Sequence, residues 1–142
     1  VFANDGTVDK FIGDAIMVMF GAPQDMDAFT QAQRAVSCAR AMQHGLGSLN
    51  ETWQARGLPP LKQRIGIHQG DVVVGNFVSD RRSDYTCICT AVNLASRIET
   101  ICSPGSVYTS SVIHEFVPDE VTLVGRFKLK GIEEEQELFE LI

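Results

Sequence analysis

The chain has 142 residues, 44% of them hydrophobic and 21% charged, which fits one globular domain and argues against disorder or a disulfide-stapled miniprotein. Twelve Lys and Arg oppose eighteen Asp and Glu, and the resulting net charge of −6 makes nucleic acid an unfavourable partner. The longest apolar runs, Ala15–Gly21 and Val72–Gly75, are far shorter than the roughly 18 residues that a membrane-spanning helix needs.

The N-terminal segment predicts a β-hairpin. Asp5-Gly6 is a turn signal, and the strand-like runs Thr7–Ile12 and Ala15–Phe20 follow, separated by a tight turn at Gly13-Asp14. Few residues precede the Asp5-Gly6 turn, and the sequence does not begin with Met. We therefore expect the chain to be a piece of a longer protein, cut inside its first hairpin.

The clearest predicted element is an amphipathic helix from Asp27 to about Ala55, in which apolar residues recur at three- and four-residue steps. Gly57–Pro60 ends this helix. Two strands, a polar loop and a short strand are expected next, at Lys62–His68, Val72–Phe77, Ser79–Asp84 and Tyr85–Ile88.

A second helix is predicted over Thr90–Cys102, with Thr90 as its N-cap. The remaining elements are expected to be a strand, a short helix and two strands, at Val107–Ser110, Val112–Phe116, Val121–Leu129 and Gln136–Ile142. Some strands are joined by helices and others by tight turns, which favours an α+β fold over a doubly wound parallel sheet. We expect a mainly antiparallel sheet with the helices packed on one face.

The cysteines and histidines do not show the spacing of a zinc site, because there is no CxxC pair and the histidines lie far from the cysteines. We interpret Cys38, Cys87, Cys89 and Cys102 as free, mostly buried thiols. His44, His68 and His114 are interpreted as surface or packing residues. The N-terminus carries no secretory signal, so the segment is expected to be cytoplasmic and without direct membrane contact.

A few polar residues could carry chemistry. Asp14 follows a glycine at a turn, where a carboxylate could bind a hard cation, although Asp is also common in turns for local hydrogen bonding. Asn93 and Arg97 share one helical face, which could hold a polyphosphate or simply face solvent. Arg64 and Lys130 are two further cations that could meet phosphates if the fold brings them together.

Five segments together resemble the catalytic domain of class III nucleotidyl cyclases. In chain order they are Val8–Met17, Arg64–Gly70, Asp84–Thr86, Ala91–Arg97 and Leu129–Gly131. They follow the family order over nearly the whole chain, and the combination is far more specific than any one segment. The resemblance implies the class III cyclase fold, of ferredoxin-like or palm type. It also implies a single catalytic domain over residues 1–142, lacking its N-terminal strand and helices.

The resemblance assigns the hairpin residues to metal and purine. In that family the counterpart of Asp14 binds two metal ions, Mg²⁺ or Mn²⁺, together with a second aspartate on a strand that precedes Val1. Lys10 and Thr86 would contact the purine, and lysine with threonine at these places is associated with adenine. Thr86 also resembles the subgroup of soluble, bicarbonate-responsive adenylyl cyclases.

The resemblance assigns the remaining residues to ribose and phosphates. Asn93 would orient the ribose, and Arg97 would meet the charge that develops on the α-phosphate. Arg64 and Lys130 would hold the terminal phosphates. The implied reaction converts ATP to 3′,5′-cyclic AMP and pyrophosphate by two-metal-assisted attack of the ribose 3′-oxygen on the α-phosphate. The site would be shared in a homodimer, or in a heterodimer with a similar domain, and this chain by itself is expected to be inactive.

One position departs from the family pattern and keeps an alternative open. Cys89 stands where such cyclases usually carry glycine, and Thr90 where many carry Asp or Asn. If this turn requires a positive φ, cysteine there would be strained by roughly 1–2 kcal/mol. The alternative hypothesis is a degenerate cyclase-like domain that binds nucleotide or a catalytic partner as a regulator. A simple interaction module is a third reading, which leaves the site residues unexplained.

Overall fold

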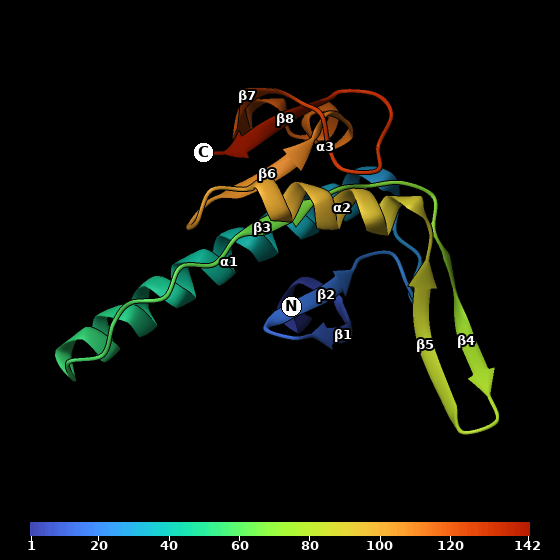
Figure 1. Cartoon of the computed structure of the whole chain (residues 1–142), viewed down its shortest axis with the longest axis horizontal. Coiled ribbons are helices and arrows are strands. Elements are labelled where there is room, and N and C mark those ends of the chain that lie inside the picture. The colour runs from blue at the N-terminus through green and yellow to red at the C-terminus, as the bar shows by residue number, and fades with distance from the viewer.

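The computed structural model describes the backbone of residues 1–142 and the side chains of all except Ser79, Arg82, Asp84, Tyr85, Thr86, Cys87 and Ile88. In chain order the elements are η1 (Phe2–Asn4), β1 (Thr7–Ile12), β2 (Ala15–Met19), α1 (Ala28–Ala55), β3 (Ile65–Ile67), β4 (Val73–Ser79), β5 (Arg82–Ile88), α2 (Thr90–Ile101), β6 (Val107–Ser110), α3 (Ser111–Phe116), η2 (Pro118–Glu120), β7 (Val121–Phe127) and β8 (Gln136–Leu141) (Figure 1). The strands form a β1-β2 hairpin, a β4-β5 hairpin and a four-stranded sheet in the order β3-β6-β8-β7.

The four-stranded sheet is the centre of the fold. Strand β3 runs parallel to β6, whereas β6-β8 and β7-β8 are antiparallel, as are the two hairpins. All four residues of β6 are buried, so both faces of the sheet need a cover. The α+β class with mainly antiparallel pairing is confirmed.

The helices do not all pack on one face, and this part of the expectation is wrong. On one face the buried side chains of α1 and α3 pack with those of the sheet, among them Val36, Ile113 and Val107. On the opposite face Ile98 of α2 packs with Tyr108 and other buried residues. Successive strand residues point to opposite faces, so the apolar neighbours Val107 and Tyr108 each require a helix of their own.

The β1-β2 hairpin follows the sequence prediction. Ile12 pairs with Ala15 across a turn in which Gly13 has a φ of 61°, a conformation that favours glycine. The hairpin is attached to the segment after β2, because the Thr7 hydroxyl donates to the Ala22 carbonyl oxygen at 2.7 Å.

The β4-β5 hairpin extends away from the helices in Figure 1. Its length shows that the loop expected at Ser79–Asp84 is too long. Strand pairing continues to Ser79 opposite Arg82, so part of the polar stretch Ser79–Asp84 is strand and not loop. A projecting hairpin need not alternate apolar and polar residues, since much of it faces water; Val73 and Val78 are 67% and 78% exposed.

The two longer helices begin close to where the sequence places them. Asp27 caps α1: its carboxylate accepts hydrogen bonds from the Thr30 amide and hydroxyl, and these bonds lower the pKa of Asp27. Helix α2 has Cys89 as its N-cap, one residue before the predicted Thr90, without a side-chain cap bond. The φ of Cys89 is −179°, an extended conformation open to any residue, so the expected strain at this position is wrong.

The described cysteines are free thiols, as expected. Cys38 and Cys102 are buried and Cys89 is partly buried, whereas Cys87 lies outside the described residues. Burial raises the pKa of the Cys102 thiol, which lies 3.2 Å from the Ser106 carbonyl oxygen. Within the described part of the chain, no helix combines the length and apolar character that a membrane crossing demands.

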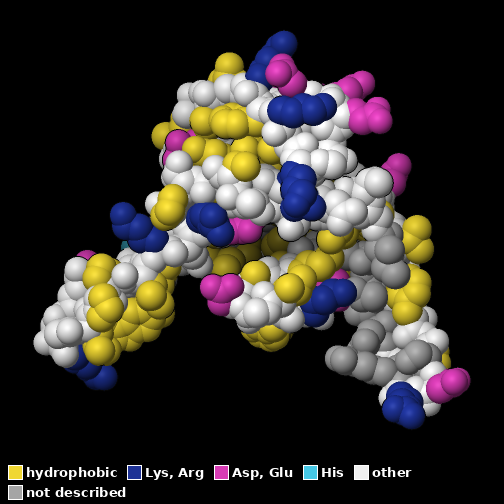
Figure 2. Space-filling view, in the orientation of Figure 1, with side chains coloured by type: hydrophobic (Ala, Val, Ile, Leu, Met, Phe, Trp, Pro, Cys, Tyr) yellow, Lys and Arg dark blue, Asp and Glu magenta, His cyan; other side chains and the backbone are white. Residues whose placement is uncertain are grey.

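The far half of α1 carries an apolar surface. Figure 2 shows hydrophobic side chains gathered over that end of the helix and the segment that returns beside it. Leu49, Leu58 and Leu61 are each about half exposed there. The Asn50 amide group ties the two segments together, with bonds of 2.8 Å to both the amide and the carbonyl of Leu61.

Gly66 in β3 lets α2 lie directly on the strand. A Cβ atom at Gly66 would lie 2.5 Å from the Glu99 amide nitrogen and 2.6 Å from the Ala95 carbonyl oxygen, both backbone atoms of α2. We therefore expect Gly66→Ala to lower the free energy of unfolding by about 1–3 kcal/mol in chemical denaturation. Gly75→Ala is the control, since a Cβ there meets nothing within 4 Å. Equal losses in both variants would contradict the close contact.

Candidate functional site

One group of predicted site residues lies on the β1-β2 hairpin. Lys10 is exposed on β1 opposite Met17, and Asp14 is exposed in the turn directly after Gly13. A carboxylate at a tight turn is a suitable ligand for a hard divalent cation. Among the residues with described side chains, no group of three or more His, Cys, Asp and Glu is arranged to hold a metal ion.

A second group lies on α2. Leu94 and Ile98 of this helix pack into the core with Tyr108. This packing fixes the rotation of the helix and leaves Asn93 exposed and Arg97 partly buried, one turn apart. The sequence prediction that the amide and the guanidinium share a helical face is confirmed.

Lys130 lies beside this helix. The preceding residue, Leu129, is 2% exposed and packs in the same cluster as Ile98. Gly131 follows with a φ of 78°, and the Lys128 ammonium donates to the Glu133 carbonyl oxygen across the loop. The buried leucine thus anchors the loop in the cluster that contains Ile98, and the Lys130 side chain is exposed.

Arg64 also contacts α2, through a partner that sequence reasoning missed. Its Nε atom lies 3.0 Å from Glu99 Oε1, and its Nη1 group donates to the Thr100 carbonyl oxygen at 3.2 Å. Both charged side chains are more than a third exposed, so this ion pair contributes at most about 1 kcal/mol. The pairing joins residues far apart in sequence, and no local signal predicts it.

The structure therefore brings the predicted residues into two groups. The hairpin group comprises Lys10 and Asp14. What we call the α2 group comprises Asn93 and Arg97 on the helix, Arg64 paired with Glu99 near its C-terminal end, and Lys130 in the loop after β7. Thr86, the other predicted purine contact, lies outside the described residues. The hairpin group lies on the two-stranded β1-β2 sheet, whereas the α2 group lies on a helix and on segments that flank strands of the four-stranded sheet. The β1-β2 hairpin reaches the second hairpin through contacts between β1 and β5.

His68 lies at the end of β3, next to the start of α2. Its Nδ1 atom is 2.8 Å from the Ser110 hydroxyl, and its Nε2 atom lies 3.3 Å from the position of a Cβ at Gly70. That same position is 3.0 Å from the Ala91 Cβ atom in the first turn of α2. His68 is thus a packing residue, as expected, and burial lowers its pKa.

The lowered pKa of His68 predicts a pH-dependent stability. The folded chain resists protonation below the ordinary pKa of 6.5, whereas the unfolded chain accepts the proton. The contribution of His68 to the free energy of unfolding should therefore be constant above about pH 7.5 and fall as the pH is lowered below about 6.5. Urea denaturation from about pH 7.5 to about pH 5.5 measures this slope. His68→Gln should flatten it, and the exposed His44→Gln variant should not; identical slopes in all three proteins would refute the assignment.

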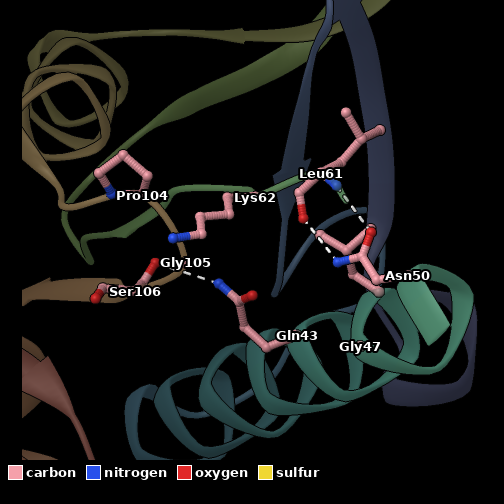
Figure 3. Close-up of a pocket in the computed structure, with 9 residues that line it drawn as sticks. Gln43, Gly47, Asn50, Leu61, Lys62, Pro104, Gly105 and Ser106 are labelled. Atoms are coloured by element: carbon pink, nitrogen blue, oxygen red, sulfur yellow. Dashed lines mark hydrogen bonds between the residues drawn. The ribbon is translucent and has the colours of Figure 1, made fainter. Parts of the chain in front are cut away.

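A separate hollow of about 330 Å³ lies beside the far half of α1 (Figure 3). Its lining includes Gln43, Asn50, Lys62 and Gly105, and none of the predicted site residues. The Gln43 amide donates to the Ser106 carbonyl oxygen at 3.3 Å, and the Asn50 amide is bonded to Leu61. These amides hold neighbouring chain segments together. We therefore interpret the side chains that line the hollow as structural.

Comparison with known proteins gives a consistent result. Residues 5–142 match the family model described as the adenylate and guanylate cyclase catalytic domain. Adenylate cyclase 1 of Rhizobium meliloti (strain 1021) is 34% identical over 100% of this chain, and the adenylate cyclase of Anabaena cylindrica is 35% identical over 96%. The chain spans 22% and 28% of the length of these two proteins. The soluble guanylate cyclase subunit beta-2 of Rattus norvegicus is 32% identical over 84% of this chain and 17% of its own length.

Solved structures give the same picture. The adenylyl cyclase CyaB from P. aeruginosa superposes with a TM-score of 0.93 at 35% identity, covering 99% of this chain and 74% of that chain. The guanylyl cyclase Cya2 superposes with a TM-score of 0.88 at 37% identity, covering 99% of this chain and 71% of that chain. Both nucleotide specificities thus occur among similar structures.

Proposed function

Because the chain belongs to the adenylate and guanylate cyclase catalytic domain family, we propose that it is the catalytic domain of an adenylyl cyclase. It converts ATP to 3′,5′-cyclic AMP and pyrophosphate, and residues 1–142 act as one domain. The observation that carries the proposal is the helix α2, which presents the Asn93 amide and the Arg97 guanidinium one turn apart on a single face. An ATP-consuming domain of this kind works in the cytoplasm.

The α2 group is suited to a nucleoside triphosphate. Asn93 can orient the ribose by hydrogen bonding, and Arg97 can face the charge that builds on the α-phosphate during in-line attack. Lys130 and Arg64 bind the terminal phosphates and the leaving pyrophosphate. Arg64 can leave Glu99 for a phosphate at low cost, because the ion pair is partly exposed and weak.

The hairpin group is suited to the metal and the purine. Asp14 would hold Mg²⁺ or Mn²⁺, two ions per site, with phosphate oxygens and a second carboxylate as further ligands. When bound, the ions acidify the 3′-hydroxyl and neutralise phosphate charge. Lys10 donates to the purine, and with Thr86 it selects adenine. We infer from Thr86 that the domain belongs to the soluble, bicarbonate-responsive subgroup.

A site made of these two groups calls for two chains. One group lies on the β1-β2 hairpin and the other on and around α2, and Lys10, Asp14 and Asn93 are all exposed to solvent. Phosphoryl chemistry gains most from charges in a water-excluded site. We infer that a second copy, or a similar cyclase domain, brings its hairpin against the α2 of the first. One site is then shared by two chains.

Nucleotide preference tests the proposal. The full-length protein with Mg²⁺ or Mn²⁺ should form cyclic AMP from ATP with a kcat/KM at least about tenfold above that for GTP, because a polar mismatch at the base is costly. Replacing Lys10 by Glu and Thr86 by Cys should reverse the preference. Equal kcat/KM values would reject the specificity. A protein that forms no cyclic nucleotide but stimulates a catalytic partner would instead be a regulator.

Complementation tests the shared site. Asp14→Ala and Arg97→Ala chains should each be nearly inactive, because every site in either dimer lacks one group. In an equimolar mixture half of the dimers are mixed and hold one intact site, so activity should return to about a quarter of wild type. Mixed dimers that form but remain inactive would argue against a site built from two chains.

A further inference from the structure

Two glutamine side chains join the start of α1 to the turn after β3. The Gln69 Nε2 group donates to Gln31 Oε1 at 2.8 Å and to the Ala28 carbonyl oxygen at 2.9 Å. The Gln31 Nε2 group donates to the Met26 carbonyl oxygen at 2.7 Å. This amide link, defined by Gln31 and Gln69, connects the segment after β2, the first turn of α1 and the turn after β3.

The partners dictate how both amides are oriented. Carbonyl oxygens only accept hydrogen bonds, so Gln31 must present its NH₂ group to Met26, and Gln69 must present its own to Ala28. The Gln69 Oε1 atom is consequently buried without a hydrogen-bond partner among the described residues. A Cβ at Gly21 would lie 2.5 Å from Gln31 Nε2, so this segment packs directly on the amide. The link is thus tightly constrained.

One end of the amide link holds the hairpin that carries Lys10 and Asp14. The Thr7 hydroxyl at the base of β1 donates to the Ala22 carbonyl oxygen, in the segment that Gln31 binds through Met26. Asp5, just before β1, lies 3.3 Å from the Arg34 guanidinium on α1. The hairpin is therefore attached to the same two segments that the Gln31 side chain joins.

The other end of the amide link reaches α2. Gly70 follows Gln69 and lies against Ala91, the second residue of α2, since a Cβ at Gly70 would be 3.0 Å from the Ala91 Cβ. Asn93 follows two residues later on the same helix. Any movement of the turn at Gln69 would therefore press on the first turn of α2.

We propose that Gln31 and Gln69 are positioning residues for the cyclase reaction, whose amide link sets the place of the β1-β2 hairpin relative to α2. This inference rests on the proposed function. In a two-fold dimer each chain gives its hairpin to one site and its α2 to the other, so a shift between them misaligns both sites. A displacement of about 1 Å is enough to lower turnover by about 100-fold.

Gln69→Glu in the full-length protein breaks the amide link with almost no change of shape. It places carboxylate oxygens against the Ala28 carbonyl and Gln31 Oε1, two acceptors. Asn50→Asp is the matched control, because it makes the same chemical change where Asn50 Nδ2 donates to the Leu61 carbonyl, near the far end of α1. Gln69→Ala removes the link without repulsion and serves if the glutamate variant does not fold.

The measurements are kcat and KM for ATP, well below the melting temperature of each variant, and hydrogen exchange of residues 7–19. The Gln69 variants should lose about ten- to 100-fold in kcat, change KM for ATP by less than about threefold, and exchange faster over residues 7–19. Asn50→Asp should keep kcat within about twofold. Unchanged kcat in both Gln69 variants, or an equal loss in Asn50→Asp, would overturn the inference.

Hydrogen exchange separates this inference from the proposed function. If the wild-type protein formed no cyclic nucleotide, the proposed reaction would fail, but the link would still be tested by exchange over residues 7–19. Faster exchange in Gln69→Glu than in Asn50→Asp would support the link between hairpin and α2. Equal exchange in wild type and Gln69→Glu would refute it, whatever the activity.

Discussion

The rest of the structure depends on the contact between the backbone of α2 and Gly66 in β3. No side chain lies between them, so backbone contact fixes the distance between the helix and the strand. Ile98 and Leu94 then fix the rotation of the helix through the core, and Leu129 brings the next loop against it. The position of each polar group on α2 follows from this one approach of helix to strand.

The exposure of the site residues is the physical basis of the proposed two-chain site. Asp14 and Asn93 lie in water, where charges interact weakly at the distances of a reaction. The chain carries a net charge of −6, yet three cations stand on or beside α2: Arg97, Arg64 and Lys130. Near these cations the surface is more favourable to a negatively charged group than the net charge of the molecule implies. In the proposed dimer, a second chain that covered this surface would strengthen each such interaction.

The sequence correctly predicted those features of the fold that depend on interactions between residues close together in the chain. The turn at Gly13-Asp14, the capped start of α1 at Asp27 and the pairing of Asn93 with Arg97 on one helical face all follow from short-range patterns. What failed depends on distant residues. The side of the sheet that α2 covers is set by Tyr108 and Leu138, and Arg64 finds Glu99 only after folding. The strain expected at Cys89 was wrong because its backbone is extended.

The two buried thiols make local opening of the structure measurable. Cys38 is buried in α1, outside the cluster that packs this helix on the sheet, whereas Cys102 is buried in the cluster that contains Ile98 of α2. Neither can react with a thiol reagent until the structure around it opens, and the pKa of Cys102, raised by burial, further disfavours its reactive thiolate. The rate at which each sulfur is labelled therefore reports how often the structure around that sulfur opens. Equal labelling rates would mean that the regions around the two thiols open together. Unequal rates would show which region is the more stable against opening.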